Sequence, residues 1–138
     1  MNYRTIHTTY GLQCMAQAES TGVPINLTHM GVGDGNGNDV TPVESLTQLA
    51  REMYREKPNR VYQPDADQPT LYAAELVVPK SVSGFVMREI ALFDADGGMF
   101  LVGNLPATYK PHESEGAYSD AVVRVLFMVS NAAIVTIQ

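Results

Sequence analysis

The longest run of strand-like sequence lies between residues 72 and 102. Segments 72–78 and 85–93 are rich in β-branched, aromatic and aliphatic residues, and residues 79–84 between them contain the Pro and Gly that interrupt strands. This pattern predicts a hairpin. Residues 94–98, Asp-Ala-Asp-Gly-Gly, then separate segment 85–93 from the apolar residues 99–102, so the sequence predicts a second hairpin directly after the first.

Segment 85–93 is apolar on both faces, since successive side chains of a strand point to opposite sides. Two covered faces predict a central strand, or a strand whose outer face meets another subunit. If Val78 lies opposite Phe85, then Glu75 lies opposite Arg88, and the two charges predict an ion pair across the first hairpin. The alternative is that both charges are solvated near the edge of the sheet.

Two helices are predicted in the first half of the chain. The first begins at a Thr cap, Thr8 or Thr9, and runs to about Ser20, because Gly22 and Pro24 would end it. The second begins at the capping box of residues 41–44, Thr-Pro-Val-Glu, and carries an apolar stripe until shortly before Pro58. Four basic residues of segment 51–60 alternate with acidic ones, which favours a solvated, salt-bridged helix face over a phosphate site.

The remaining segments predict strands and loops. Residues 25–32 alternate as a strand with a change of face at His29, residues 31–39 read as a Gly-rich loop, and residues 59–63 form a short strand before a surface loop at 64–69. Residues 105–120 read as a long polar insertion, and residues 122–130 and 134–137 as a final hairpin. The predicted fold is α+β: one domain of residues 1–138, mainly antiparallel β hairpins with two N-terminal helices.

Composition narrows the possible functions. The net charge of −6 argues against nucleic acid as a partner, because nucleic-acid binding needs a positive surface. Cys14 is the single cysteine, which excludes an intrachain disulfide and favours a buried, inert thiol. No signal peptide and no membrane-spanning run is visible, so synthesis in a cytoplasm and no membrane partner are expected.

The sequence offers little catalytic chemistry. Asp34, Asn36 and Asn38 match the opening of a calcium loop, but Asp39 and Ser45 stand where such a loop needs Gly and Glu. The glycines of residues 31–35 lack the remaining residues of a phosphate-binding loop, and Asp94 and Asp96 fit a turn better than a ligand pair. The histidines at positions 7, 29 and 112 have no ligand spacing. We expect no enzyme, no cofactor and no metal.

Five blocks in order along the chain resemble the N-terminal domain of phage tail-collar fibre proteins, found on contractile-tailed bacteriophages and R-type bacteriocins. These blocks are residues 30–35, 74–79, 84–94, 104–111 and 125–137. The resemblance implies a structural virion protein that anchors a fibre to the baseplate of a contractile tail and supports host attachment indirectly. It also implies self-association as a homotrimer and a following fibre shaft or separate fibre protein. Because the sequence stops at Gln138, it is expected to be either an excised attachment domain or a short stand-alone adaptor.

Within that resemblance, the loops at 31–39 and 105–120 are the predicted partner contacts, since binding residues concentrate on loops of rigid scaffolds. Tyr109, Lys110 and Asp34 are the candidate residues. The alternative for Tyr109 and Lys110 is that they only pack their own loop. Two other classes of function stay open: a carbohydrate-binding receptor-recognition module, and an enzyme such as a polysaccharide depolymerase that would use Asp34 or Asp94.

Overall fold

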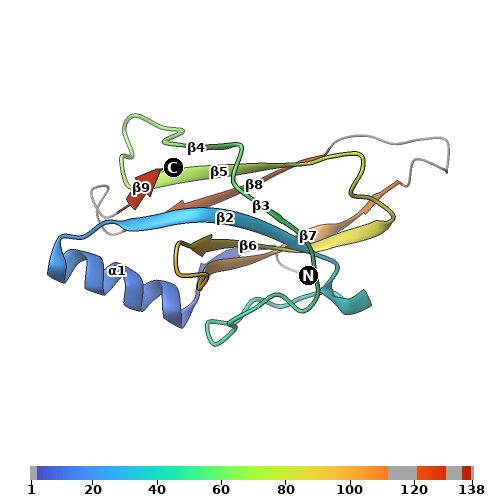
Figure 1. The fold of residues 1–138 in the computed structure, drawn as a ribbon, viewed down its shortest axis with the longest axis horizontal. Helices are drawn as coiled ribbons and strands as arrows, with labels where there is room; N and C mark the ends of the chain where they lie inside the picture. The colour runs from blue at the N-terminus through green and yellow to red at the C-terminus, as the bar shows by residue number, and fades with distance from the viewer. Residues whose placement is uncertain (1–2, 112–120, 130–134, 138) are drawn as a thin grey trace.

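The computed structural model describes residues 3–111, 121–129 and 135–137, which form two β-sheets and one α-helix (Figure 1). The larger sheet has the order β1-β7-β6-β2-β3, and β9 also pairs with β2. The smaller sheet has the order β4-β5-β8. The larger sheet contains β1 (Thr5–His7), β2 (Ile25–Gly33), β3 (Glu52–Glu56), β6 (Phe85–Asp94), β7 (Met99–Lys110) and β9 (Val135–Ile137). The smaller sheet contains β4 (Arg60–Tyr62), β5 (Leu71–Val78) and β8 (Ala121–Met128).

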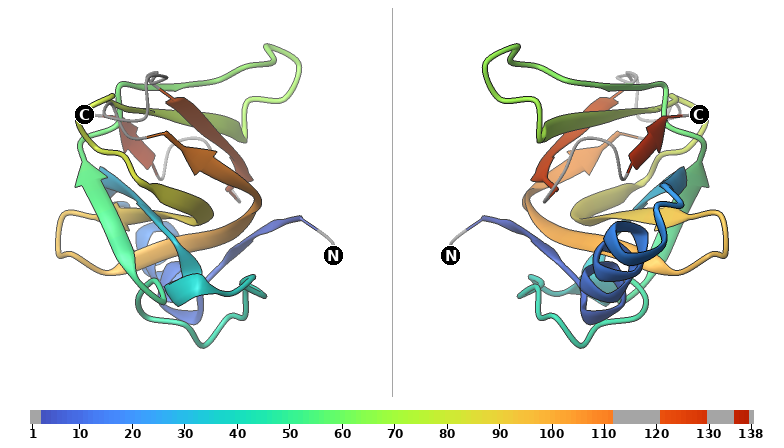
Figure 2. Two further views of the ribbon diagram at one scale, coloured as in Figure 1. Left: turned by 90° about the vertical axis from the view of Figure 1, so that its right-hand side faces the viewer. Right: turned by 90° about the vertical axis from the view of Figure 1, so that its left-hand side faces the viewer.

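The main core lies between the two sheets, which face each other in the end-on views (Figure 2). The smaller sheet contributes alternate residues of β5 and β8, and the larger sheet contributes residues of β2, β6 and β7. A second, smaller cluster covers the opposite face of the larger sheet, where Leu49 and Leu46 pack against Ala91, Phe93 and Val102. Both faces of β6 are therefore covered, as its apolar sequence predicts.

The predicted first helix is confirmed as α1 (Thr9–Thr21), at the end of the larger sheet where β2 begins (Figure 1). Thr8 is the N-cap and its hydroxyl accepts a hydrogen bond from the N–H of Gly11 at 2.9 Å. Gly22 ends the helix in the left-handed conformation, with φ of 75°. Gly11 lets the helix approach β7 closely, because a Cβ atom there would lie only 2.0 Å from the carbonyl oxygen of Phe100.

Three further predictions are confirmed in the larger sheet. β6 and β7 form the predicted antiparallel hairpin, and β6 is central because it also pairs with β2. The predicted change of face in β2 is a bulge between Leu27 and His29, since the pairing with β6 shifts register there. Leu27 and Met30 are consequently both buried, while His29 is exposed.

Both other predicted hairpins are wrong. β5 does not pair with β6; it pairs with β4 and β8 in the smaller sheet, and residues 79–84 cross from one sheet to the other. Facing sheets are about 10 Å apart, a gap that six residues easily span. β8 and β9 do not pair with each other either. β8 pairs with β5, whereas β9 pairs in parallel with the start of β2. The turn predicted between those two strands, at 131–133, lies outside the described residues.

The predicted second helix is wrong as well. Residues 41–51 form turns and irregular backbone, and β3 (Glu52–Glu56) pairs with the end of β2. Leu46 and Leu49 are used to cover the outer face of the larger sheet, and the backbone of Ala50 is held by a buried carboxylate of β6. Tertiary contacts therefore override a strong local helix signal. The fold class is α+β with one helix rather than two.

The long polar insertion is shorter than predicted. β7 continues to Lys110, so residues 105–110 are strand and not loop, while residues 112–120 lie outside the described part of the chain. The short strand predicted at 59–63 is confirmed as β4, and residues 64–69 carry no strand. None of the described helical residues belongs to a helix with the length and hydropathy needed to cross a bilayer.

Candidate partner-binding surfaces

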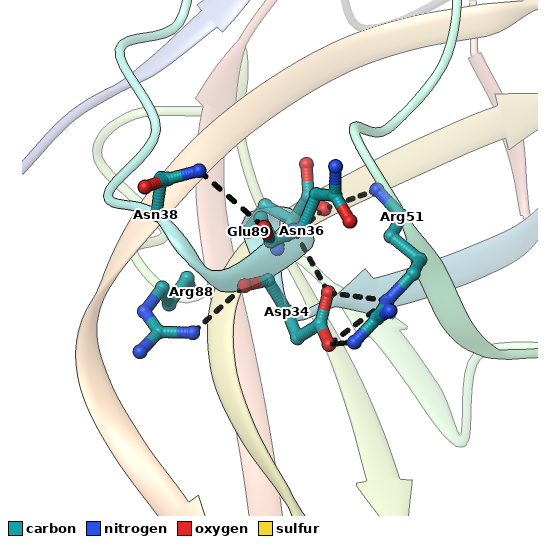
Figure 3. A network of polar contacts seen from close by, with 7 residues as sticks. Asp34, Asn36, Asn38, Arg51, Arg88 and Glu89 are labelled. Carbon is teal, nitrogen blue, oxygen red and sulfur yellow. Dashed lines mark hydrogen bonds and ion pairs between the residues drawn. The ribbon is translucent and has the colours of Figure 1, made fainter.

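The Gly-rich segment after β2 is fixed by an ion pair rather than left as an open loop (Figure 3). Asp34 is 4% exposed, and both of its carboxylate oxygens accept hydrogen bonds from Nε of Arg51 at 3.0 Å. Nη2 of Arg51 also pairs with Asp34. The backbone N–H of Asn36 donates to the same carboxylate at 2.8 Å, and Nη1 of Arg88 donates to the carbonyl oxygen of Asp34 at 2.9 Å. The Arg51 guanidinium lowers the pKa of Asp34 below its usual 3.8.

A second buried carboxylate, that of Glu89 on β6, ties two segments to the sheet (Figure 3). It is 1% exposed and accepts hydrogen bonds from the backbone N–H groups of Gly35 at 3.0 Å, Ala50 at 2.8 Å and Arg51 at 3.0 Å. Three donors compensate the cost of burying the charge. The residues predicted as a Gly-rich loop therefore form part of a closed structural network.

The three residues predicted to contact a partner differ in how far their side chains are exposed. Tyr109 is 48% exposed on β7 and stays a candidate. Lys110 is 2% exposed and Asp34 is 4% exposed, so neither presents a side chain at the surface of the chain. A carboxylate already bound to Arg51 is also poorly suited to the catalytic role considered for Asp34.

The predicted Glu75–Arg88 ion pair is not formed, because β5 and β6 lie in different sheets. Glu75 instead lies opposite Arg124 of β8, and the carboxylate Oε2 accepts a hydrogen bond from Nε of Arg124 at 2.7 Å. The hydroxyl of Tyr62 donates to the same oxygen at 3.2 Å. Sequence reasoning found the correct acidic residue and the wrong partner strand.

Segment 51–60 forms no helix: Arg55 lies on β3 and Arg60 on β4, while Arg51 precedes β3 and Lys57 follows it. Arg55 donates to Glu52 at 2.7 Å, and its guanidinium carbon lies 3.6 Å from the centre of the Phe93 ring. Arg60 stacks over Tyr62 at 3.7 Å. Charge pairing was predicted correctly for Glu52 and Arg55, although the element was not.

Strand β8 is apolar on both faces, but only one face is covered by the described residues. Its inward side chains belong to the main core: Val123, Val125 and Phe127. Its outward side chains Val122, Leu126 and Met128 are 62%, 53% and 52% exposed. Leu71 and Val77 of β5 lie opposite Met128 and Val122 and extend the same apolar row. We call this outward row of β5 and β8 the β8 face.

The β8 face can be covered by a partner without leaving a charged residue unpaired. Arg124, the charged residue in the outward row of β8, is already paired with Glu75, so covering the row would not strand an unpaired charge. β8 is also the last strand of its sheet in the described part of the chain. A strand with an apolar sequence on both sides is typical of strands that are covered on both sides. Sequence reasoning missed this face, although residues 121–128 carry the same two-sided pattern that was recognised in residues 85–93.

The turn between β6 and β7 is organised by Asp94, as the sequence predicted. Its Oδ1 accepts hydrogen bonds from the backbone N–H groups of Asp96 at 3.1 Å and Gly98 at 2.9 Å. Its Oδ2 accepts the hydroxyl of Tyr10 at 2.5 Å and lies 3.7 Å from Sγ of Cys14. The hydrogen bond to Asp94 raises the pKa of Tyr10, and burial raises the pKa of the Cys14 thiol.

The described residues contain no cluster of His, Cys, Asp or Glu that could hold a metal ion. The described residues do carry an exposed apolar row on the outer side of the smaller sheet, the β8 face.

The chain belongs to the phage tail-collar fibre protein family, as its N-terminal domain: the family described as "Phage tail-collar fibre protein, N-terminal" matches residues 1–138. The chain is 36% identical over 134 residues to the "Probable tail fiber protein" of Escherichia phage P2. That match covers 96% of this chain and 20% of the relative, so the chain spans about a fifth of the length of the curated relative it matches. No solved structure matches the chain. The family places the chain among the structural proteins of the virion tail.

Proposed function

We propose that this chain is the attachment domain of a tail fibre, which holds the fibre on the baseplate of a contractile tail and so supports host adsorption indirectly. The observation that carries the proposal is the β8 face. A structural tail domain must bind another tail component, and an exposed apolar row whose charged residue Arg124 is already paired is suited to a stable protein contact.

The occupant of the β8 face in this proposal is a baseplate protein of the tail. The paired state of Arg124 and Glu75 means that the matching surface should be mainly apolar. Tyr109 is proposed as a peripheral contact, since exposed Tyr residues often serve as anchors in interfaces. The resemblance further implies a homotrimer in the particle, followed by a fibre shaft or a separate fibre protein. A stand-alone adaptor of the same tail would use the same face.

The test is assembly of tail particles with a substituted chain. Leu126→Asp places a charge on the β8 face, and Leu12→Asp places the same charge on the exposed side of α1, where Leu12 is 44% exposed. Both variants should fold, because surface substitutions usually change stability by about 0.5 kcal/mol or less. Leu126→Asp should be lost from purified tails, as measured by blotting, while Leu12→Asp should be retained. Retention of Leu126→Asp at the wild-type level would contradict the β8 face as the attachment surface, and absence of the wild-type chain from tails would contradict attachment itself.

A further inference from the structure

A pocket of about 360 Å³ lies between helix α1, the start of β2 and the β6–β7 turn. Its buried lining includes two apolar residues, Ala18 and Ile25, which are 4% and 7% exposed. Val23 and Pro24 continue the apolar wall, and both are exposed. This volume is at the lower end of the range for ligand sites, which suits a single extended side chain better than a large organic ligand.

The electrostatic environment of the pocket favours a cation. The charged residues among its described lining are both acidic, Asp94 and Asp96. Ala18 and Thr21 belong to the C-terminal turn of α1, where the helix carbonyls carry partial negative charge. That last turn contains no basic residue, and no basic residue belongs to the described lining of the pocket.

The lining also contains an acceptor that has no hydrogen-bond partner among the described residues. Oδ1 of Asn26 is shielded from solvent and accepts no hydrogen bond from the part of the chain that the structure describes. A buried polar atom without a partner costs about 1–3 kcal/mol, and a ligand donor that reached this oxygen would remove that cost. Asp94, by contrast, is fully used by the turn, by Tyr10 and by Cys14. Asp96 contributes its backbone N–H to the turn and is exposed, which leaves its carboxylate for a ligand.

We infer that this pocket binds the side chain of an arginine from a protein partner. The apolar wall suits the aliphatic stem, while the carboxylate of Asp96, the amide of Asn26 and the end of α1 suit a planar group with several donors. A divalent metal would need more oxygen ligands than one available carboxylate supplies. That this partner is another tail protein rests on the proposed function. That the ligand is an arginine side chain does not rest on it.

The experiment is a titration of the 138-residue chain, followed by the amide resonances in nuclear magnetic resonance spectra. The probes are n-butylguanidinium, its neutral analogue N-butylurea, and the capped tripeptide Gly-Arg-Gly. Saturable shifts should appear at residues lining the pocket with n-butylguanidinium and with the tripeptide, and N-butylurea should bind several-fold more weakly.

Two matched variants test the contribution of the Asp96 carboxylate to binding. Asp96→Asn should weaken binding of n-butylguanidinium by roughly three- to five-fold, as removal of one exposed charge pair does. Asp67→Asn is the control, because Asp67 occupies the same position of a similar turn: its N–H donates to Asp65, just as the N–H of Asp96 donates to Asp94. It should leave binding unchanged.

Three results would overturn the inference: equal binding of N-butylurea, equal weakening by both variants, or no saturable shift at the pocket. Binding of n-butylguanidinium without binding of the tripeptide would overturn the protein partner. The pocket is formed by α1, β2 and the β6–β7 turn, so these results do not depend on the β8 face, and failure here would leave the proposed attachment intact.

Discussion

Gly33 lies directly against the carboxylate of Glu89: a Cβ atom at position 33 would be 2.4 Å from Oε2 of Glu89 and 2.3 Å from the carbonyl oxygen of Arg51. The end of β2, the middle of β6 and the segment before β3 therefore meet at one point without room for a methyl group. This contact holds the segment of residues 34–51 against the larger sheet.

Gly33→Ala should be strongly destabilising for this reason. The nearest atoms include backbone, which cannot rotate away, so the free energy of unfolding should fall by about 2–3 kcal/mol, as for overpacked cores. Gly31→Ala is the matched control in the same strand, where the nearest atom is 3.1 Å away on the side chain of Phe93. Urea denaturation of both variants measures the difference, and equal losses would contradict the close contact at Gly33.

Glu89→Gln should lower the free energy of unfolding by about 2–4 kcal/mol. The amide keeps the shape of the side chain, but it replaces one acceptor oxygen with a donor that faces backbone N–H groups. The control is Glu44→Gln, at an exposed position, which should change stability by about 0.5 kcal/mol or less. A wild-type denaturation midpoint for Glu89→Gln would show that the carboxylate network does not contribute to stability.

Exchanging charges should identify the partner of Glu75. Glu75→Arg should destabilise the fold slightly, and Arg124→Glu added to it should restore much of the loss, because the two residues face each other across β5 and β8. The coupling should be about 0.5–1 kcal/mol, since Arg124 is largely exposed. Arg88→Glu in place of Arg124→Glu should give no rescue. A double-mutant cycle by thermal denaturation distinguishes the two pairings, and rescue by Arg88→Glu alone would favour the original sequence prediction.

Acid should destabilise the protein in two ranges of pH. Burial lowers the pKa of His7 below its usual 6.5, so the unfolded chain binds a proton that the folded chain does not, and stability should decrease as the pH falls below about 6.5. The lowered pKa of Asp34 acts later: its ion pair contributes fully above pH 3.8 and is lost as the pH falls through the folded pKa.

The His7 contribution can be removed separately. His7→Gln should flatten the dependence of the unfolding free energy on pH between neutrality and about pH 5 and leave the loss at lower pH in place. Denaturation curves at a series of pH values measure both. An unchanged slope in His7→Gln above pH 5 would assign the upper range to another group.

Short sequence signals correctly predicted those elements that depend on residues close together in the sequence. The Thr8 cap with Gly22 located α1, the alternation with a break at His29 located the bulge of β2, and the Asp94 turn located the β6–β7 hairpin. The capping box at 41–44 is an equally local signal, yet the helix it predicts does not form. Leu46 and Leu49 stabilise the fold more by covering β6 and β7 than they would on a helix.

Sheet membership could not be predicted, because it depends on pairings between segments far apart in the sequence. Nothing near Glu75 indicates that β8 rather than β6 lies beside it, and the ion-pair prediction failed with the register on which it rested. The same limit applied to Lys110, whose polar sequence surroundings suggested a loop, although the continuation of β7 buries it. The β8 face, however, could be predicted from the two-sided apolar pattern of residues 121–128.

The parallel pairing of β9 with the start of β2 has a mechanical consequence. The two strands run in the same direction and match Ile25 with Val135 and Leu27 with Ile137. Tension applied along the axis of β9 from its C-terminal side would load every hydrogen bond of this pairing in shear at once, and not peel them apart one after another. β2 would pass that load through its pairing with β6 into the centre of the larger sheet.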